Sequence, residues 1–236
     1  MGRELYCRDP VFKKWLEQMD TIAGDLTGRS ILARLYDEEM KPGDNFDRLS
    51  ITHPAIFMVE YALAQTLSQM GVEPAAVCGT SMGEFAAAAA AGVMSPEEAL
   101  EMIVRQAEMV ENFCRQDQGG GGMMTILHDA SLYRKHPLLR ENIELAAVNY
   151  RGHFVISGKK EILEEIQAFL KKEGITCQRL PVSFAFHSRW IDPAGPAYCA
   201  YLHKKQFQRP RLPMVSCLYG RVIEAIPPDY FWQVVR

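Results

Sequence analysis

Residues 79–84 decide how this chain folds, and they read Gly79-Thr80-Ser81-Met82-Gly83-Glu84. The short apolar segment 75–78 before them predicts a strand, and the alanine-rich segment 85–91 after them predicts a helix. A serine between two glycines at a strand-to-helix turn is the pattern of a nucleophile elbow, because the tight turn leaves no room for Cβ atoms on both sides. A plain glycine-rich turn is the alternative, and the flanking strand and helix favour the elbow.

The expected turn has a chemical consequence for Ser81. It lifts the hydroxyl above the edge of the sheet, and the next helix directs its first N–H groups to the same place. The main-chain N–H of Met82 is then the candidate donor to an oxyanion. Alanines let this helix lie close to the sheet, since larger side chains would hold it away. We therefore expect an α/β layer with Ser81 as the candidate nucleophile.

The segments around the elbow predict the rest of a large α/β subdomain. Residues 1–50 indicate helices that are interrupted by turns at Gly28 and at residues 41–45. An amphipathic helix is predicted over residues 51–70, with Pro54 near its start and an apolar stripe of Ile56, Val59, Leu63 and Leu67. The sequence Ser95-Pro96-Glu97-Glu98 is a capping box that predicts a helix ending near Cys114.

A smaller subdomain is predicted after Gly119–Gly122, four glycines that indicate a flexible connection. The patterns that follow predict a strand at 123–127, a helix at 131–140, strands at 145–149 and 153–157, a helix at 161–172 and a strand at 176–182. This β-α-β-β-α-β order is typical of a ferredoxin-like unit. We expect a large α/β-hydrolase-like subdomain from residues 1–118 and 185–236, an inserted ferredoxin-like small subdomain over residues 123–184, and an active site between them.

The composition favours a cytoplasmic protein that binds no metal. A net charge of −3 without a basic cluster argues against binding to nucleic acid. The longest apolar stretch, residues 85–94, is too short to cross a membrane, and no secretion leader opens the chain. The six cysteines are scattered without a metal-binding spacing, so we expect small buried residues rather than ligands or disulfides.

Six histidines compete for the role of the base that activates Ser81. His187 differs from the others because it follows the apolar residues 182–186, at the point where the chain returns to the large subdomain. From the residue pattern alone, a structural histidine at the end of a strand is the alternative.

Several motifs carry a family resemblance, which decides between a catalytic and a structural role for His187. They are residues 79–85, Ala185-Phe186-His187-Ser188, Ala147-Val148-Asn149 with Val155-Ile156-Ser157-Gly158, and the helical residues 53–64. Together they resemble the acyltransferase family, which contains malonyl-CoA:acyl-carrier-protein transacylases and the acyltransferase domains of polyketide synthases. The resemblance runs in one order over nearly the whole chain. It departs from the family at Thr80, where the family has histidine, at a position beside the chemistry.

The resemblance implies a Ser81–His187 dyad, in which His187 deprotonates Ser81, an acyl-enzyme forms, and a second nucleophile removes the acyl group. It also implies substrate-binding roles for Gln106, Phe186, Asn149 and His53. The implied partner is an acyl carrier protein, with an acyl-CoA or other acyl thioester as substrate. No separate cofactor is implied, because the phosphopantetheine arm of the carrier protein, or CoA, is part of the substrate.

Gln106 separates the possible reactions. In malonyl-transferring relatives, an arginine on the helix after the nucleophile binds the carboxylate of the substrate, and counting from Ala99 places Gln106 at that position. Neighbouring residues on a helix diverge by about 100°, so Gln106 is expected on the core-facing side and Arg105 on the solvated, charged side. A buried glutamine bonded to nearby backbone is the structural alternative. The replacement is similar to that in the acyl hydrolases of trans-acyltransferase polyketide pathways, which clear acyl groups from stalled carrier proteins.

The resemblance also implies that parts of the family fold lie outside the chain. Met1 is similar to residues just after the family's G-Q-G-S-Q strand, and residues 230–232 precede its last strands. We therefore expect one central strand, one oxyanion donor and the backbone that orients His187 to be absent. Asp192, which precedes Pro193, is interpreted as a turn residue rather than a substitute orienter.

Three functions stay open from the sequence. A hydrolase of acyl groups on acyl carrier proteins is the first choice, a malonyl-CoA:acyl-carrier-protein S-malonyltransferase is the second, and an inactive truncated remnant is the third. An unrelated esterase with the same elbow is a distant fourth, because the sequence offers no good acid partner for its histidine.

Overall fold

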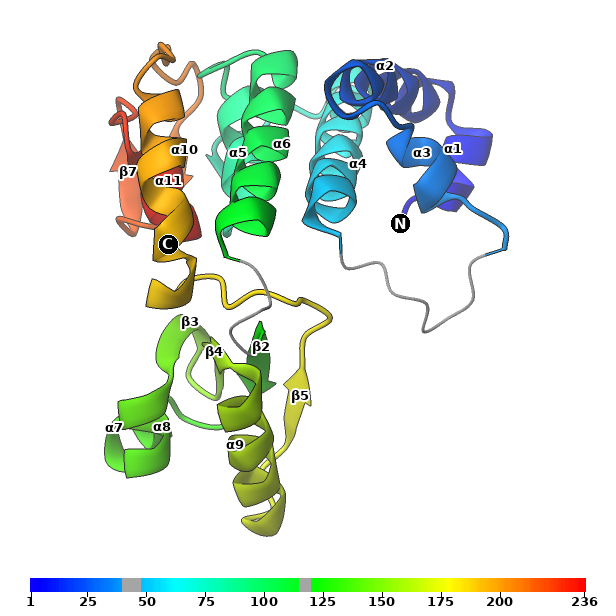
Figure 1. Cartoon of the computed structure of the whole chain (residues 1–236). Helices are drawn as coiled ribbons and strands as arrows, with labels where there is room; N and C mark the ends of the chain where they lie inside the picture. Colours follow the sequence, from blue (N-terminus) through cyan, green and yellow to red (C-terminus); the bar gives the residue numbers. More distant parts are fainter. Residues whose placement is uncertain (40–47, 115–119) are drawn as a thin grey trace. The chain divides into compact units, whose positions relative to one another are not determined.

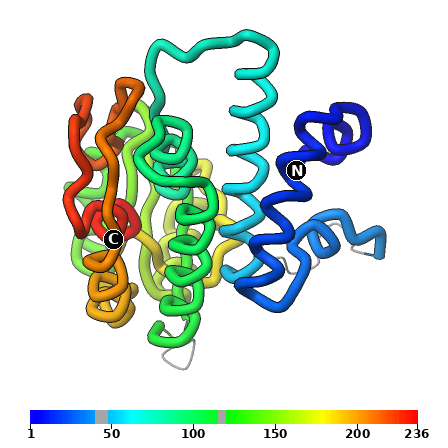
Figure 2. Tube along the Cα trace, turned by 90° about the horizontal axis from the view of Figure 1, so that it is seen from above, coloured from blue at the N-terminus to red at the C-terminus, as the bar shows by residue number. Residues whose placement is uncertain are grey.

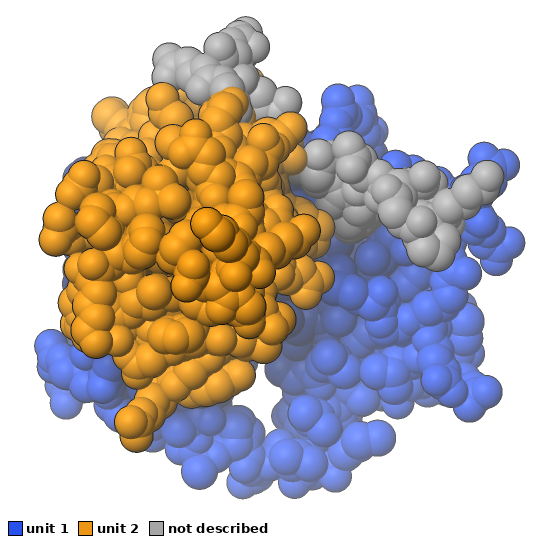
Figure 3. All heavy atoms as spheres, turned by 90° about the horizontal axis from the view of Figure 1, so that it is seen from below, with its two compact units in different colours: residues 1–108, 198–234 blue, residues 109–197, 235–236 orange. Residues whose placement is uncertain are grey.

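A computed structural model describes residues 1–39, 48–114 and 120–236 of the chain. These residues form two compact units, residues 1–108 with 198–234 and residues 109–197 with 235–236 (Figure 3). The units therefore divide near residues 108 and 197, whereas the sequence places the subdomain boundaries near residues 118 and 185. The turn expected at residues 41–45 lies outside the described residues.

The first unit opens with helices that pack on one another. They are α1 (Arg3–Arg8), α2 (Pro10–Thr27), α3 (Ile31–Leu35) and α4 (Leu49–Gln69). Asp9 caps α2 by accepting hydrogen bonds from the N–H groups of Val11 and Phe12 at 2.9 and 2.8 Å. Gly28 ends α2 with a φ of 72°, which only glycine adopts at little cost. The predicted break at Gly28 is confirmed.

Helix α4 confirms the predicted helix and, through the buried Val59, only part of its predicted apolar stripe. Leu63 and Leu67 are 36% and 49% exposed, whereas Phe57, Met58 and Ala62 are fully buried. Most of the residues that bury this helix lie beside the predicted stripe. The error arose because α4 is apolar on most of its circumference, so periodicity alone cannot select the buried side.

The sheet of the first unit has the order β1-β6-β7. Its strands are β1 (Val77–Cys78), β6 (Met214–Ser216) and β7 (Arg221–Ile223), with β1 parallel to β6 and β7 antiparallel to β6. Helix α5 (Gly83–Ala90) contacts β1 and β6, and Ala88 is fully buried in it. The prediction that alanines let α5 lie against a sheet is confirmed.

Three further helices are α6 (Pro96–Phe113), α10 (Gly195–Leu202) and α11 (Tyr230–Val235). The N–H of Ser95 donates to Glu98 at 2.9 Å, and the N–H of Glu98 donates to the Ser95 hydroxyl at 3.1 Å, so the predicted capping box is confirmed. Residues 198–234, drawn orange to red, lie beside the green α5 and α6 (Figure 1, Figure 2). The Tyr198 hydroxyl joins them by donating to the carbonyl of Met102 at 3.2 Å.

The second unit contains a sheet of order β3-β4-β2-β5 in which every neighbouring pair is antiparallel. The strands are β2 (Gly121–Ile126), β3 (Glu144–Tyr150), β4 (His153–Lys159) and β5 (Cys177–Arg179), and the helices are α7 (Ser131–Lys135), α8 (Pro137–Asn142) and α9 (Lys160–Lys172). This strand order is that of the predicted ferredoxin-like unit. Its core is the cluster that contains Met124, Phe154, Ile156 and Leu163.

Several local predictions in the second unit are wrong in instructive ways. The helix expected at 131–140 is two helices, because Pro137 lacks the N–H that would continue α7 through His136. Gly121 and Gly122 are not part of a flexible connection but the first residues of β2, whereas Gly119 lies outside the described residues. A Cβ on Gly121 would lie 2.6 Å from the backbone nitrogen of Ala185, so close packing explains this glycine. The strand expected at 176–182 extends only over residues 177–179.

Candidate active site

The turn that carries Ser81 has the geometry that its sequence predicts. Ser81 has a φ of 55°, in the left-handed region that a residue with a side chain rarely adopts. A Cβ on Gly79 would lie 2.1 Å from the carbonyl of Gly83, so this position accepts only glycine. The N–H of Gly83 donates to the main-chain carbonyl of Thr80 at 3.0 Å, and the N–H of Glu84 donates to the main-chain carbonyl of Ser81 at 3.0 Å. The strand β1 thus turns sharply into α5 with Ser81 at the corner.

Met82 directly follows the corner and already has helical dihedral angles, with φ −55° and ψ −33°. Met82 is the N-cap residue of α5, so its N–H lies at the helix N-terminus, where the helix dipole favours negative charge. This placement is compatible with the oxyanion role of Met82, which stays a prediction.

Glu84 anchors the elbow to the next strand. Its side chain is fully buried, and its carboxylate accepts a hydrogen bond from the N–H of Cys217 at 2.5 Å. The Tyr230 hydroxyl lies 2.9 Å from the same carboxylate and 2.7 Å from the hydroxyl of Ser216. Burial, followed by the hydrogen bond with Glu84, raises the pKa of the Cys217 thiol to about 11. In the sequence, the only signal for this anchor is a carboxylate in the first turn of α5.

His53 and Gln106 form a buried pair in the first unit. His53 Nδ1 lies 3.3 Å from Gln106 Oε1, and the two residues are 7% and 1% exposed. The amide oxygen only accepts, so Nδ1 carries the hydrogen of this bond. Burial lowers the pKa of His53 to about 4, and the hydrogen bond to Gln106 offsets only part of that effect. At neutral pH both side chains are therefore uncharged.

Arg105 lies on a different side of α6 from Gln106. Its guanidinium pairs with Glu108 at 2.8 Å, and its side chain is 40% exposed. The predicted register of α6 is confirmed, with Gln106 buried and Arg105 on the charged, solvated side. The amide oxygen of Gln106 contacts a side chain from α4. A substrate-binding role for Gln106 and His53 stays a prediction.

His187 also has a left-handed backbone, with a φ of 58°. Among the described residues, Ser81 and His187 are the only non-glycine residues with positive φ. Strained backbone of this kind is concentrated at functional sites. The N–H of His187 donates to the carbonyl of Val235 at 3.1 Å. Residue 235 therefore holds the main chain of His187.

Ser81 belongs to the first unit and His187 to the second, so their pairing as a dyad stays a prediction. The same holds for an active site between the two units.

Phe186 and Asn149, the other predicted substrate-binding residues, both lie in the second unit. Phe186 is 7% exposed, and its ring centroid lies 6.2 Å from that of Phe184. Asn149 is exposed on β3, and its Nδ2 lies 3.3 Å from Nδ1 of His153, whose Nε2 contacts the hydroxyl of Thr125. His153 was expected only as a residue at the start of a strand. Its spacing of four residues from Asn149 across a tight hairpin was the available signal.

A pocket of about 360 Å³ lies beside these polar groups. It is lined by residues of β2, β3, β4 and β5 and of their ends: Thr125, Leu127, Asn149, His153, Val155, Thr176, Cys177, Gln178 and Leu180. Apolar side chains thus form much of its wall, and His153 with its contacts Asn149 and Thr125 contributes to the polar lining.

All six cysteines are free thiols. Cys7, Cys78 and Cys217 are exposed, so the expectation that every cysteine is buried was wrong for these three. Within residues 1–39, 48–114 and 120–236, no group of three His, Cys, Asp or Glu side chains is arranged to hold a metal ion. Over the same residues, no helix combines the length and the hydropathy that crossing a membrane requires.

Comparison with known proteins gives the family. The sequence profile of the acyl transferase domain matches residues 1–225. The polyketide biosynthesis acyltransferase homolog PksD of Bacillus subtilis (strain 168) is 43% identical over 236 residues, which are 100% of this chain and 72% of PksD. The polyketide biosynthesis protein ThaF of Burkholderia thailandensis is 40% identical over 225 residues, which are 95% of this chain and 19% of ThaF.

Solved structures agree with this assignment. The acyltransferase domain from the second module of the salinomycin polyketide synthase has a TM-score of 0.84 and 32% identity. The match covers 100% of this chain and 54% of the chain in that structure, so the chain spans about half of that relative. The profile matches nearly all residues, and the mixed α/β fold matches as well. The chain therefore belongs to the acyl transferase domain family.

Proposed function

We propose that this chain hydrolyses acyl groups from acyl carrier proteins of polyketide biosynthesis, through an acyl-enzyme on Ser81. The Ser81 hydroxyl attacks the thioester carbonyl while His187 takes its proton, and the phosphopantetheine thiol leaves with a proton from His187. Water then attacks the acyl-enzyme with His187 as the base, which releases a carboxylic acid and free Ser81. The N–H of Met82 stabilises the oxyanion in both steps.

The backbone geometry supports these roles. An elbow with φ of 55° exposes a serine at a helix N-terminus, where both a nucleophile and an oxyanion are favoured. His187 has comparable strain at the other position that the family resemblance implies. Such conformations persist only where the surrounding contacts hold them, and they are costly for a residue without a function.

The neutral His53–Gln106 pair is the single observation that carries the choice of a hydrolase for neutral acyl groups. A malonyl group has a carboxylate, and a buried carboxylate needs a positive charge or several hydrogen bonds to the charged form. The pair supplies no charge at neutral pH, because burial lowers the pKa of His53 to about 4. We propose that Gln106 and His53 bind near the acyl group, with Phe186 and Asn149 as further substrate-binding residues.

The names of two relatives support a role in polyketide biosynthesis. PksD and ThaF are named as polyketide biosynthesis proteins, and both match nearly the whole chain. The proposed substrate is therefore an acylated carrier protein of such a pathway, with the acyl group on its phosphopantetheine arm.

The test is to incubate the purified chain with acetyl-loaded and malonyl-loaded carrier protein and to follow each by intact mass. We expect loss of acetyl from the carrier protein, with acetate as the product and no acyl group on an added unloaded carrier protein. Ser81→Ala is the control and should leave the acetyl group in place. Glu108→Gln, on the solvated side of α6, should behave as the unaltered chain.

A malonyl transferase is the alternative, since malonyl transacylases share the fold, as in the Burkholderia pseudomallei enzyme with a TM-score of 0.80 and 26% identity. Stable malonyl loading of Ser81, followed by transfer to the unloaded carrier protein, would favour it. If neither carrier protein changes, the inactive remnant becomes the better account.

A further inference from the structure

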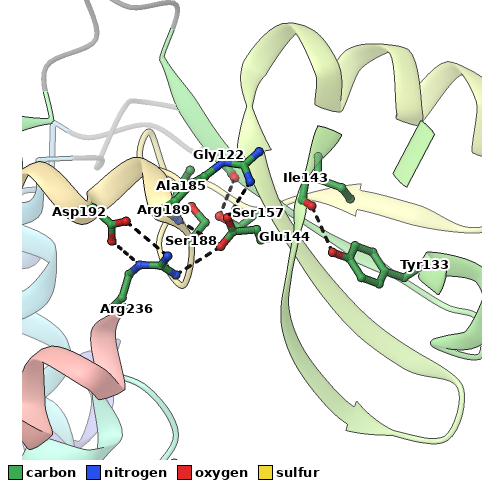
Figure 4. Close-up of polar contacts among 10 residues, drawn as sticks. All are labelled: Gly122, Tyr133, Ile143, Glu144, Ser157, Ala185, Ser188, Arg189, Asp192 and Arg236. Atoms are coloured by element: carbon green, nitrogen blue, oxygen red, sulfur yellow. Dashed lines mark hydrogen bonds and ion pairs between the residues drawn. The ribbon is translucent and has the colours of Figure 1, made fainter. Parts of the chain in front are cut away.

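The segment that carries His187 is held by charged side chains that no proposed chemical step uses (Figure 4). Arg236 lies at the centre of this arrangement. Its Nε and Nη2 contact the carboxylate of Asp192, with Nη2 3.4 Å from Oδ2, and its Nη1 lies 3.3 Å from Glu144 Oε2. One guanidinium therefore joins the first residue of β3 to the 3₁₀ helix η2 (Arg189–Ala194), which follows His187.

Glu144 makes a second connection to the same segment. Its Oε2 accepts a hydrogen bond from the main-chain N–H of Arg189 at 3.1 Å, and its Oε1 lies 3.4 Å from the Arg189 guanidinium. The carboxylate thus fixes backbone two residues after His187, while Arg236 fixes the side chain five residues after it. We name Glu144, Asp192 and Arg236 the carboxylate–arginine clamp.

Hydrogen bonds also hold the backbone just before His187 and the main-chain N–H of His187 itself. The Ser188 hydroxyl is buried and donates to the Ala185 carbonyl at 2.5 Å, which closes a tight turn around His187. The carbonyl of Val235, next to Arg236 in the chain, accepts from the N–H of His187 at 3.1 Å. Residues 235 and 236 therefore contact both His187 and the helix that follows it.

These contacts explain how His187 keeps its backbone conformation. A φ of 58° is unfavourable for histidine, and it persists only where neighbouring contacts over-determine the chain. The turn at residues 185–188 fixes the backbone before and at His187, and the clamp fixes the backbone after it. Loss of the clamp would let η2 move, and His187 could then relax toward an ordinary φ.

We infer that the clamp of Glu144, Asp192 and Arg236 positions the imidazole of His187 for catalysis. This inference rests on the proposed role of His187 as the base. The three are positioning residues, since none has to touch the substrate, and they act through the backbone of residues 187–192. Their side chains are 24%, 51% and 33% exposed, so the clamp works partly in contact with water and weakens as salt is raised.

The test compares Arg236→Gln, Arg236→Lys and Glu144→Gln in the full chain. A displaced base slows chemistry more than substrate binding, so we expect kcat for deacylation to fall about tenfold to 100-fold while KM changes little. Arg236→Lys keeps the charge but loses the planar, multidentate contact, and it should recover part of kcat. Arg140→Gln is the matched control, because Arg140 pairs with Glu141 at 2.8 Å on the exposed surface of the same unit.

A spectroscopic measurement separates this inference from the proposed function. The ¹H–¹³C signal of the His187 imidazole, assigned with His187→Gln, should shift or broaden in Arg236→Gln and in Glu144→Gln but not in Arg140→Gln. If the chain hydrolyses no thioester, the proposed function fails, and this signal still tests the clamp. Unchanged signal and unchanged kcat in both clamp variants would overturn the inference, as would an equal loss in Arg140→Gln.

Discussion

His53 Nδ1 and Gln106 Oε1 lie 3.3 Å apart and join α4 to α6 through two buried, uncharged side chains. Gln106 occupies the position at which, according to the family resemblance, malonyl-transferring relatives have a carboxylate-binding arginine. The proposed choice of substrate therefore rests on a contact between residues that are 53 positions apart in the sequence.

Gln106→Arg should shift preference toward malonyl substrates. The new guanidinium would supply the charge that a carboxylate needs, but without that carboxylate it is a buried, unpaired charge. We expect the variant to be less stable than the unaltered chain, and to gain thermal stability from malonyl-CoA but not from acetyl-CoA. Thermal unfolding with each ligand checks this. Arg105→Gln, which changes only the solvated side of α6, should show neither effect, and equal stabilisation by both ligands would contradict the prediction.

Stability should decrease as the pH falls below neutral because of His53. Its pKa is about 4 in the folded chain and 6.5 in the unfolded chain, so the unfolded state binds the proton first. The loss begins near pH 6.5, grows until about pH 4, and reaches about 3 kcal/mol. His53→Asn should flatten this part of the profile of unfolding free energy against pH. The exposed His128→Asn is the control, and a profile unaltered by His53→Asn would count against the burial argument.

Gly79→Ala should be far more harmful than an ordinary glycine substitution. The added Cβ would lie 2.1 Å from the Gly83 carbonyl, so the elbow would have to open. The loss of unfolding free energy should exceed about 1 kcal/mol, which is the size of the gain that Gly→Ala gives where the backbone accepts a side chain. Gly152→Ala offers the comparison, since nothing lies within 4 Å of the Cβ position of Gly152. Chemical unfolding of both variants tests this, and similar values would refute it.

Glu84→Gln should loosen the elbow without removing a reacting group. The carboxylate accepts from the Cys217 N–H at 2.5 Å and lies 2.9 Å from the Tyr230 hydroxyl, and an amide replaces one acceptor with a donor. We expect a loss of about 1–3 kcal/mol in unfolding free energy. Glu97→Gln, in the first turn of α6, is the matched control. No difference between the two variants would show that Glu84 does not anchor the elbow.

The sequence predicted those features that depend on neighbouring residues. The capping box of Ser95 and Glu98 and the turn at Gly79–Gly83 need only a few consecutive residues, and both have the expected geometry. The register of α6 followed from the helical period, which placed Gln106 inside and Arg105 outside.

The features that the sequence did not predict depend on distant contacts. Gly121 looked like part of a flexible connection, and only the approach of Ala185 explains it. The buried side of α4 was misassigned because most of that helix is apolar. The anchor of Glu84 joins it to Cys217, which no local pattern could connect.

The central claim is that Ser81 carries the acyl group and that water removes it. The most direct measurement is a rapid-quench reaction with acetyl-loaded carrier protein, followed by peptide mapping of the chain by mass. We predict one acetyl group on the peptide that contains Ser81 at early times, its loss as acetate forms, and its absence in Ser81→Ala. An acetate yield that proceeds equally in Ser81→Ala, or an acetyl group found only on another peptide, would contradict the account.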